Sequence, residues 1–453
     1  MSRPGTEQNP LRVAIVGSGP SGFYAAEALF KSDHTVTVDM IERLPAPFGL
    51  VRNGVAPDHP KLKQPIQVYD KIAQTQGFNF VGNVTVGRDV TVEELSATHH
   101  AILFTCGAET DRRLGVPGED LPGSHTATEF VGWYNGHPDF QDRVFDLGQE
   151  VAVVIGQGNV AADVARMLAK SADELATTDI TQHALEALAA SRVREIHVIG
   201  RRGPAQAKFT SKELRELGEL ANCSAIVDPL DLRLNSESVT ELADKNNYTA
   251  AKNVELFQSW AASPVSDKAR RIVFHFLASP VELRGEGRLE RLVLERNRLE
   301  GAPFAQVARG TGERFELACG LLFRSVGYRG MPIPGVPFDH QRCVFPNDNG
   351  RVVGASGLYA AGWIKRGPTG IIGTNRADAV ATVATLLGDL EKLDPAAKPG
   401  ADGLHALLAR RGIKVVNYRD WQRIDAQEIE RGKPKDKPRE KFTRVEEMLA
   451  ALG

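Results

Sequence analysis

Residues 11–22 read LRVAIVGSGPSG, and this stretch decides the fold. It starts with an apolar run that is long enough for a buried strand, and the helical pattern FYAAEALFKS follows it. Between the two, Gly17, Gly19 and Gly22 form a GxGxxG turn. The first glycine of such a turn allows a tight bend, the second lets the backbone approach a pyrophosphate, and the third lets the helix pack on the strand. The stretch therefore predicts the first βαβ unit of a dinucleotide-binding fold.

An acidic residue stands where this first unit would meet a ribose. A second apolar run, residues 35–41, ends at Glu42, about 20 residues after the turn, where the fold places an acid. A carboxylate at that point accepts hydrogen bonds from a ribose diol, and the N-terminus of the preceding helix offers N–H groups to phosphates. We therefore expect the first turn to hold a dinucleotide without a 2′-phosphate.

A second turn repeats the pattern with the opposite charge. The apolar run 151–155 leads into residues 156–161, GQGNVA, which is the GxGxxA variant, and the next strand-like run ends in Arg201 and Arg202. An acid would repel a 2′-phosphate, whereas guanidinium groups bind phosphate oxygens bidentately. We expect this turn to hold NADP, and the alternative is a solvated basic strand end. Two such sites in one chain indicate a flavoprotein, in which FAD in the first site accepts hydride from NADPH in the second.

Three further segments lead to structural expectations. The proline-rich stretch 45–65 is expected to be an irregular, functional loop. Alternating apolar and polar residues predict short antiparallel strands between about 271 and 323. The segment 432–442, GKPKDKPREKF, is charged and contains prolines, so we expect a surface linker there.

The composition excludes several classes of protein. A chain of 453 residues is long enough for two or more domains, and a net charge of -2 argues against a dedicated nucleic-acid binder. The four cysteines are scattered without a CxxC pair, so we expect no redox-active disulfide and no metal site. No apolar run is long enough to span a bilayer, and the N-terminus does not resemble a signal or transit peptide. We therefore expect a cytoplasmic protein.

Longer motifs carry a family resemblance. In chain order they are GSGPSGFYAAEAL, LPAPFGLVRNGVAPDHPKLK, FVGWYNG, GQGNVAADVAR, GRRGPAQAKFTSKEL and GWIKRGPTGIIGTNRADA. Together they closely resemble the adrenodoxin reductase family of NADPH–ferredoxin reductases, over nearly the whole chain. The resemblance implies an α/β fold of two three-layer, Rossmann-like dinucleotide-binding domains, with the NADP domain inserted in the FAD domain. It places the FAD domain at residues 1–109 and 331–453, which include the C-terminal tail, and the NADP domain at residues 110–330.

The resemblance also implies the site residues. The FAD set is Gly17, Gly19, Ser21, Gly22, Glu42, Leu50, Val86, Trp363, Gly370, Ile371 and Ile372. The NADP set is Arg112, Gln157, Gly158, Asn159, Val160, Arg201, Arg202 and Glu213. The candidate catalytic residues are His59 and Asp163, which match family positions close to the flavin, and Glu213, which matches one at the nicotinamide end.

Each catalytic candidate has a structural alternative. A histidine such as His59 can relay a proton near neutral pH, but lone histidines are more often structural. Asp163 lies one turn into a predicted helix and can instead interact with the dipole of that helix. Glu213 can instead pair with a neighbouring lysine on its own helix.

The resemblance implies an acidic ferredoxin, an iron–sulfur protein, as the electron acceptor. A basic rim would steer such a partner, and the candidates are Lys208, Lys212, Arg215, Lys268, Arg270 and Arg271. A solvated charged face is the alternative for any one of them. We expect no nucleic-acid partner and a monomeric protein.

Other activities remain as alternatives, namely an NADPH diaphorase, a flavin monooxygenase and a non-enzymatic NADPH sensor. Residues 130–137, FVGWYNGH, are similar to the monooxygenase pattern FxGxxxH, but the histidine comes one residue late. A disulfide reductase would need a CxxC pair, and Trp363 stands where many flavoproteins with two dinucleotide sites place an aspartate. The sequence therefore favours an oxidoreductase that passes electrons to a ferredoxin.

Overall fold

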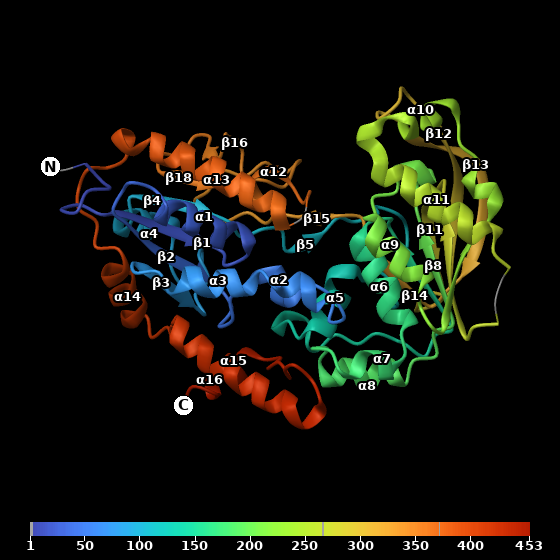
Figure 1. Ribbon diagram of the computed structural model, residues 1–453, viewed down its shortest axis with the longest axis horizontal. Coiled ribbons are helices and arrows are strands. Elements are labelled where there is room, and N and C mark those ends of the chain that lie inside the picture. Colours follow the sequence, from blue (N-terminus) through green and yellow to red (C-terminus); the bar gives the residue numbers. More distant parts are fainter. Residues whose placement is uncertain (1–2, 265–266, 371) are drawn as a thin grey trace. The chain divides into compact units, whose positions relative to one another are not determined.

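The computed structural model describes residues 3–264, 267–370 and 372–453 (Figure 1). The chain forms two compact units. Unit 1 comprises residues 1–110 and 327–453, and unit 2 comprises residues 111–326. The chain therefore leaves unit 1 once and returns to it. The short strands β5 (Thr110–Asp111) and β15 (Tyr328–Arg329), which lie at these two boundaries in the sequence, pair with each other.

Unit 1 is built on a seven-stranded sheet in the order β16-β17-β18-β4-β1-β2-β3. Its parallel strands are β1 (Leu11–Val16), β2 (Val36–Glu42), β3 (Phe78–Gly82), β4 (Ala101–Phe104) and β18 (Leu358–Ala360). The short strands β16 (Asn347–Asp348) and β17 (Arg351–Val352) add an antiparallel edge. N-terminal strands, blue in Figure 1, and C-terminal strands, orange, thus share one sheet.

Helices cover both faces of this sheet. Side chains alternate along β1, so Leu11, Val13 and Ile15 join one core while Ala14 and Val16 join another. The first core is covered by α1 (Pro20–Phe30), α3 (Ile66–Ala73), α13 (Ile372–Gly388), α15 (Tyr418–Gly432) and α16 (Val445–Ala450). The second core is covered by α4 (Val92–Thr98) and α14 (Ala401–Arg410). The short helices of the unit are α2 (Gly49–Asn53) and α12 (Trp363–Arg366), with 3-10 turns at Pro60–Lys63, Leu390–Lys392 and Lys433–Lys435.

Unit 2 has a parallel six-stranded sheet between two different layers. Its strands are β6 (Ser124–Thr126), β14 (Leu321–Arg324), β7 (Val151–Ile155), β8 (Glu195–Ile199), β10 (Arg270–His275) and β9 (Cys223–Val227), in that order. One face packs on α5 (Ala127–Asn135), α6 (Asn159–Ala169), α7 (Ala172–Ala176), α8 (Gln182–Ala189), α9 (Ser211–Gly218) and α11 (Tyr248–Ala262). The other face packs on an antiparallel sheet of β11 (Ala278–Arg284), β12 (Arg291–Glu300) and β13 (Val307–Ala318). The unit also contains α10 (Ser236–Ala243) and 3-10 turns at Pro138–Phe140, Pro204–Gln206, Pro229–Leu232 and Lys245–Asn247.

The prediction of antiparallel strands throughout residues 271–323 is wrong at both ends of that range. β10 pairs in parallel with β8 and β9, and β14 pairs in parallel with β6 and β7, so only β11 to β13 are antiparallel. Alternation of apolar residues reports which faces of a strand are buried. It does not report the direction of the neighbouring strand.

Two expectations about loops also need correction. The stretch 45–65 is not wholly irregular, because it contains α2 and a 3-10 turn. The segment 432–442 is not a surface linker, because Lys437, Glu440 and Lys441 are buried in unit 1. Lys437 Nζ lies 2.8 Å from Glu440 Oε2. Buried charges are stable only when they are paired and hydrogen-bonded, so this segment is part of the fold.

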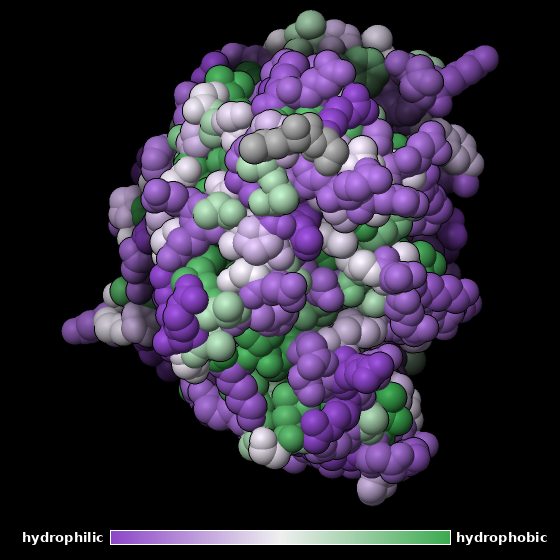
Figure 2. All heavy atoms as spheres, turned by 90° about the vertical axis from the view of Figure 1, so that its left-hand side faces the viewer, coloured by the Kyte–Doolittle hydropathy of each residue, from purple (hydrophilic) through white to green (hydrophobic). Residues whose placement is uncertain are grey.

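The predicted fold class is confirmed, since the chain forms two three-layer α/β units with parallel central sheets and one unit is inserted in the other. Among the described residues, no helix combines the length and the hydropathy that a bilayer span requires. Hydrophilic side chains predominate on the face drawn in Figure 2, and apolar ones gather in smaller areas.

Candidate cofactor sites

The first glycine turn lies between β1 and α1 and has one open position. Gly17 has a φ of 105°, and a Cβ there would lie 2.8 Å from the backbone of Cys106. A Cβ at Gly22 would overlap the carbonyl oxygen of Gly17, so this glycine lets α1 pack against the turn. At Gly19, by contrast, a Cβ would meet nothing within 4 Å. The backbone at Gly19 is therefore the place where a pyrophosphate can approach the turn.

The carboxylate of Glu42 is already oriented at this turn. Ser18 donates to Glu42 Oε2 through its backbone N–H (3.2 Å) and its hydroxyl (2.6 Å), and the backbone N–H of Leu44 donates to Oε1 at 3.2 Å. These donors hold the carboxylate at the end of β2, beside the glycine turn. The arrangement leaves an oriented anion that can accept hydrogen bonds from a ribose diol. The open space at Gly19 and this anion together fit FAD.

The other predicted FAD residues of the first half of unit 1 lie around this turn or at the edge of the sheet. Ser21 is buried in α1, and a Cβ at Gly362 would overlap its hydroxyl. Leu50 is exposed in α2. Val86 is half-buried and forms an isolated bridge with Val90.

The predicted flavin-ring segment forms the start of α12 and α13. The indole of Trp363 stacks on the ring of Tyr328, with centroids 5.4 Å apart and planes at 30°, and its N–H donates to the carbonyl of Thr369. Gly370 has a φ of 85° and is exposed. Ile372 begins α13 and is half-buried, whereas Ile371 lies outside the described residues.

Sequence reasoning missed an acid that organises this segment. Asp378 accepts a 2.5 Å hydrogen bond from the backbone N–H of Gly362 through Oδ2, and Lys365 Nζ lies 2.9 Å from its Oδ1. Lys365 also donates to Thr382 at 3.0 Å. Nothing in the residue types marks Asp378 out, because it stands on an ordinary helix and meets Gly362 only through the packing of α13.

The second glycine turn has the same three roles. Gly156 has a φ of 141°, and a Cβ there would overlap the carbonyl of Ser325. A Cβ at Gly158 would meet nothing within 4 Å, and Ala161 is fully buried where α6 packs on the sheet. As in the first turn, the open glycine, Gly158, lies two residues after the glycine with a positive φ, Gly156. The turn therefore presents bare backbone in the manner that a second pyrophosphate requires.

Hydrogen bonds tie the second turn to the chain after β8. Gln157 Nε2 donates to the carbonyl of His275 at 3.1 Å, and Lys208 N–H donates to the carbonyl of Gln157 at 2.7 Å. The side-chain oxygen of Asn159 accepts from the backbone N–H of Thr210 at 2.8 Å. Val160 is half-buried beside them. These contacts fix the turn against residues 208–210 and against the end of β10.

Arg201 and Arg202 follow β8 with their guanidinium groups available. Their carbonyls accept from Asn297 Nδ2 at 2.9 Å and from the backbone N–H of Leu277 at 3.0 Å. In the described part of the chain, neither guanidinium forms an ion pair. Burial, and then the charge of Arg201, lowers the pKa of Arg202, so a bound dianion would relieve this repulsion. Arg112, the other predicted NADP arginine, is exposed.

A buried arginine joins two of the catalytic candidates. Arg166 of α6 is 1% exposed, and its guanidinium lies 2.7 Å from Asp163 Oδ1 and 3.7 Å from Glu213 Oε2. Glu213 therefore meets an arginine of another helix, while Lys212 on its own helix lies 3.8 Å from Glu216. Sequence reasoning did not name Arg166, although its i, i+3 spacing from Asp163 was a usable signal. His59, the third candidate, is buried in unit 1 immediately before the turn Pro60–Lys63.

The predicted basic residues of unit 2 differ in how many contacts hold their side chains. Lys268 donates to the carbonyls of Leu220 and Cys223, and Arg270 donates to those of Ala169 and Lys170. Arg271 forms an ion pair with Glu195. All of the predicted basic residues except the half-buried Arg270 are exposed, namely Lys208, Lys212, Arg215, Lys268 and Arg271.

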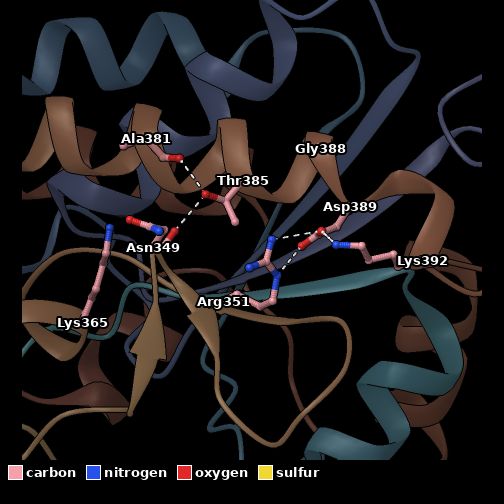
Figure 3. Close-up of a pocket in the computed structure, with 8 residues that line it drawn as sticks. All are labelled: Asn349, Arg351, Lys365, Ala381, Thr385, Gly388, Asp389 and Lys392. Atoms are coloured by element: carbon pink, nitrogen blue, oxygen red, sulfur yellow. Dashed lines mark hydrogen bonds and ion pairs between the residues drawn. The ribbon is translucent and has the colours of Figure 1, made fainter.

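A pocket of about 410 Å³ in unit 1 contains none of the predicted site residues (Figure 3). Arg351 holds Asp389 with two hydrogen bonds of 2.6 and 3.0 Å, and Lys392 lies 2.7 Å from the same carboxylate. These contacts, first of all the hydrogen bond from Arg351, lower the pKa of Asp389 to about 2. The charges of this pocket are thus satisfied within the fold.

Comparisons with known proteins agree with this geometry. Residues 11–203 match the family model of the pyridine nucleotide-disulphide oxidoreductases. NADPH-ferredoxin reductase FprA of Mycobacterium leprae is 46% identical over 446 residues, which are 96% of this chain and 97% of the relative. The mitochondrial NADPH:adrenodoxin oxidoreductase of Bos taurus is 44% identical over 462 residues, which are 99% and 93% of the two chains. The solved structure of Mycobacterium tuberculosis FprA in complex with NADPH superposes with a TM-score of 0.94 at 46% identity, covering 98% of this chain and all of that one.

The fold and the two turns define a two-dinucleotide oxidoreductase. Within that class, the chain belongs to the family of the NADPH-ferredoxin reductases and the NADPH:adrenodoxin oxidoreductases.

Proposed function

We propose that the protein is an NADPH–ferredoxin oxidoreductase, which takes electrons from NADPH through noncovalent FAD and delivers them to a ferredoxin. One observation carries the proposal. Two equivalent glycine turns are each followed by a helix and a strand, and the charges at the ends of these strands are opposite: Glu42 after the first turn, and Arg201 with Arg202 after the second. The names of the full-length relatives describe the same activity. The domain assignment follows, with FAD in residues 1–109 and 331–453 and NADP in residues 110–330.

Bound FAD would supply the redox chemistry, since a flavin accepts a hydride's two electrons and releases them singly. The chain's own residues bind and orient. Glu42 holds a ribose diol, the N–H groups of α1 and α6 meet the pyrophosphates, and the two arginines hold the 2′-phosphate. Trp363, Leu50 and Val86 would contact the flavin nucleotide, and Gly370 and Ile372 would lie next to the flavin ring. Gln157, Asn159, Val160 and Arg112 complete the NADP site.

The catalytic candidates have distinct tasks in this proposal. His59 relays a proton, because an imidazole ring has one nitrogen that can accept a proton and one that can donate it. Arg166 pairs with Asp163 and Glu213 and fixes the direction of both side chains in unit 2. Hydride transfer itself needs no acid or base, so loss of one of these groups should slow turnover without abolishing it.

An acidic iron–sulfur protein is the proposed partner. Lys212 and Arg215 project from α9 and are exposed, which suits steering of a partner with negative charge. Lys208 is a less suitable probe because its backbone bridges to Gly158. A monomer in a reducing, cytoplasmic compartment completes the proposal, and the free, mostly buried cysteines are consistent with it.

The test is NADPH-driven reduction of cytochrome c with and without an added ferredoxin. We expect strong stimulation by ferredoxin that falls as salt is raised, because exposed charges are screened. The double variant Lys212→Glu with Arg215→Glu should lose this stimulation but keep ferricyanide reduction. Reduction of bound flavin by NADPH without stimulation by any ferredoxin would instead indicate a diaphorase with another acceptor.

A further inference from the structure

The C-terminal arm, residues 418–442, places buried charges against α2. Glu428 is fully buried, Arg52 is 4% exposed and Lys441 is 2% exposed. Arg52 Nη2 lies 2.5 Å from Glu428 Oε1, and Lys441 Nζ donates to the carbonyl of Arg52 at 3.2 Å. The arm also holds Glu428 itself, since the backbone N–H of Phe442 donates to the same Oε1 at 3.0 Å. The arm therefore grips both the side chain and the backbone of Arg52.

An aromatic contact adds to this grip. The guanidinium of Arg52 lies over the ring of Trp421 at 4.9 Å, and the ring of Phe48 meets the same indole edge-on at 5.8 Å. Trp421 is 2% exposed. A desolvated cation over an indole face and an edge-to-face aromatic pair both favour one defined arrangement of residues 48–52.

The opposite side of residues 48–52 lies on the first glycine turn. The backbone N–H of Phe48 donates to the carbonyl of Ser18 at 3.1 Å. A Cβ at Gly49 would lie 3.1 Å from the Cα of Gly19, so the two glycine backbones are in close contact. Phe48 has a φ of 83°, a left-handed conformation that a bulky residue keeps only when its surroundings enforce it. The surroundings that enforce it are the turn on one side and the arm on the other.

We propose that the C-terminal arm is a clamp that holds residues 48–52 against the first glycine turn, and that Arg52 is a positioning residue for the FAD site. The inference rests on the proposed function for the assignment of FAD to that turn. Gly19 is the open position of the turn, and Gly49 sets the backbone beside it. A shift of α2 would therefore change the room available to a pyrophosphate without removing any group that touches it.

The choice of charged residues supports a positioning role. A buried ion pair stabilises a fold no better than well-packed apolar residues do, but loss of Arg52 would leave the buried Glu428 with the longer ion-pair contact to Arg439, at 3.5 Å. Arg52, Glu428 and Lys441 thus make one placement of α2 much more stable than its alternatives. FAD binding and the packing of the arm on α2 are then linked. If the packed arm raises the affinity for FAD, bound FAD must stabilise the packed arm by the same factor.

The first test is FAD release from the purified holoenzyme, followed by the rise in flavin fluorescence after dilution. Arg52→Met and Trp421→Ala should each release FAD roughly ten-fold faster than the wild type, because each removes contacts of the strength of a buried charged hydrogen bond. The matched control is Arg351→Met, which breaks the ion pair with Asp389 in the pocket of Figure 3. The control should release FAD within about two-fold of the wild-type rate, which corresponds to less free energy than one hydrogen bond contributes.

A second readout separates positioning from general stability. If Arg52→Met and Arg351→Met lower the unfolding temperature of the apo-protein equally but also release FAD at equal rates, the clamp is refuted. Arg52→Lys should restore part of the retention, since it keeps the buried charge. A wild-type chain that binds no FAD at all would overturn the proposed function, which is a different failure.

Hydrogen exchange on the wild-type protein tests the linkage without any variant. Amides of residues 428–442 should exchange more slowly with FAD bound than without it, and by a larger factor than amides of the control segment 385–392. Equal changes in the two segments would overturn the clamp, because a general stabilisation protects both alike.

Discussion

The two glycine turns of this protein have their glycines in the same arrangement but differ in the charge at the end of the next strand. Gly17 and Gly156 are the positions that only glycine fits, and Gly19 and Gly158 are the open ones. β2 ends at Glu42, which Ser18 and Leu44 hold, whereas β8 is followed by Arg201 and Arg202. The comparison teaches that the backbone of either turn can accommodate a pyrophosphate, whichever nucleotide carries it. We propose that the side chains at the strand end select between a ribose diol and a 2′-phosphate.

Removal of both arginines is expected to have the largest effect on this comparison. The double variant Arg201→Ala with Arg202→Ala should weaken NADPH binding by roughly 100- to 20,000-fold, because the two guanidinium–phosphate contacts together contribute about 3–6 kcal/mol. NADH, which lacks the 2′-phosphate, should bind about as before. Steady-state KM values for the two nucleotides measure the difference. An equal loss for both would show that the arginines do not contact that phosphate.

A pH dependence should appear at the second turn. Burial, and then the charge of His197, lowers the pKa of His275 to about 4, and its carbonyl holds Gln157 of the turn. In the unfolded chain the ring of His275 takes up a proton near pH 6.5, so the contribution of neutral His275 to the free energy of unfolding is present above pH 6.5. It is lost as pH falls from about 6.5 to about 4, by up to about 3 kcal/mol. Unfolding by urea between pH 7 and 4 measures the slope.

The control for that slope is His275→Gln, which cannot take up the proton. Its stability at pH 7 will be lower because a buried ring is lost, but the difference from the wild type should shrink as pH falls. A constant difference at every pH would contradict the depressed pKa of His275.

Neutralisation of the acid tests the first turn. Glu42→Gln keeps the shape of the side chain but weakens its acceptors, so FAD should bind about 10-fold more weakly, by about 1.5 kcal/mol. The preference for NADPH over NADH should not change. Titration of the apo-protein with FAD, followed by quenching of flavin fluorescence, gives the dissociation constant. A changed nucleotide preference would mean that Glu42 serves the other site.

The smallest effect is expected from a single methyl group at each open position. Gly19→Ala and Gly158→Ala should leave the free energy of unfolding of the apo-protein within about 0.5–1 kcal/mol, because the new Cβ meets no protein atom. Gly19→Ala should weaken only FAD, and Gly158→Ala only NADPH. Isothermal titration with each nucleotide separates the two losses. If either variant weakened both nucleotides alike, the assignment of one turn to each would fail.

Much of the site could be predicted because its signals are local. Strand, turn and helix follow one another within a dozen residues in LRVAIVGSGPSG, and the charge at each strand end is read directly from the chain. The long motifs then placed the chain in its family, which the comparisons confirmed. The residues that position these signals could not be predicted. Asp378, Arg166 and the C-terminal arm are ordinary charged residues until the fold brings their partners to them.

The sequence by itself determined the two dinucleotide turns, their opposite charges and the α/β class, because each depends on residues that are near neighbours in the chain. Only the tertiary structure decided that β10 and β14 lie parallel in the central sheet, since alternation carries no direction. Only the tertiary structure anchored the charged segment 432–442 in unit 1, where Lys437, Glu440 and Lys441 are buried. Arg52 and Glu428 stand 376 residues apart, and a charge can be buried only where the fold delivers its partner.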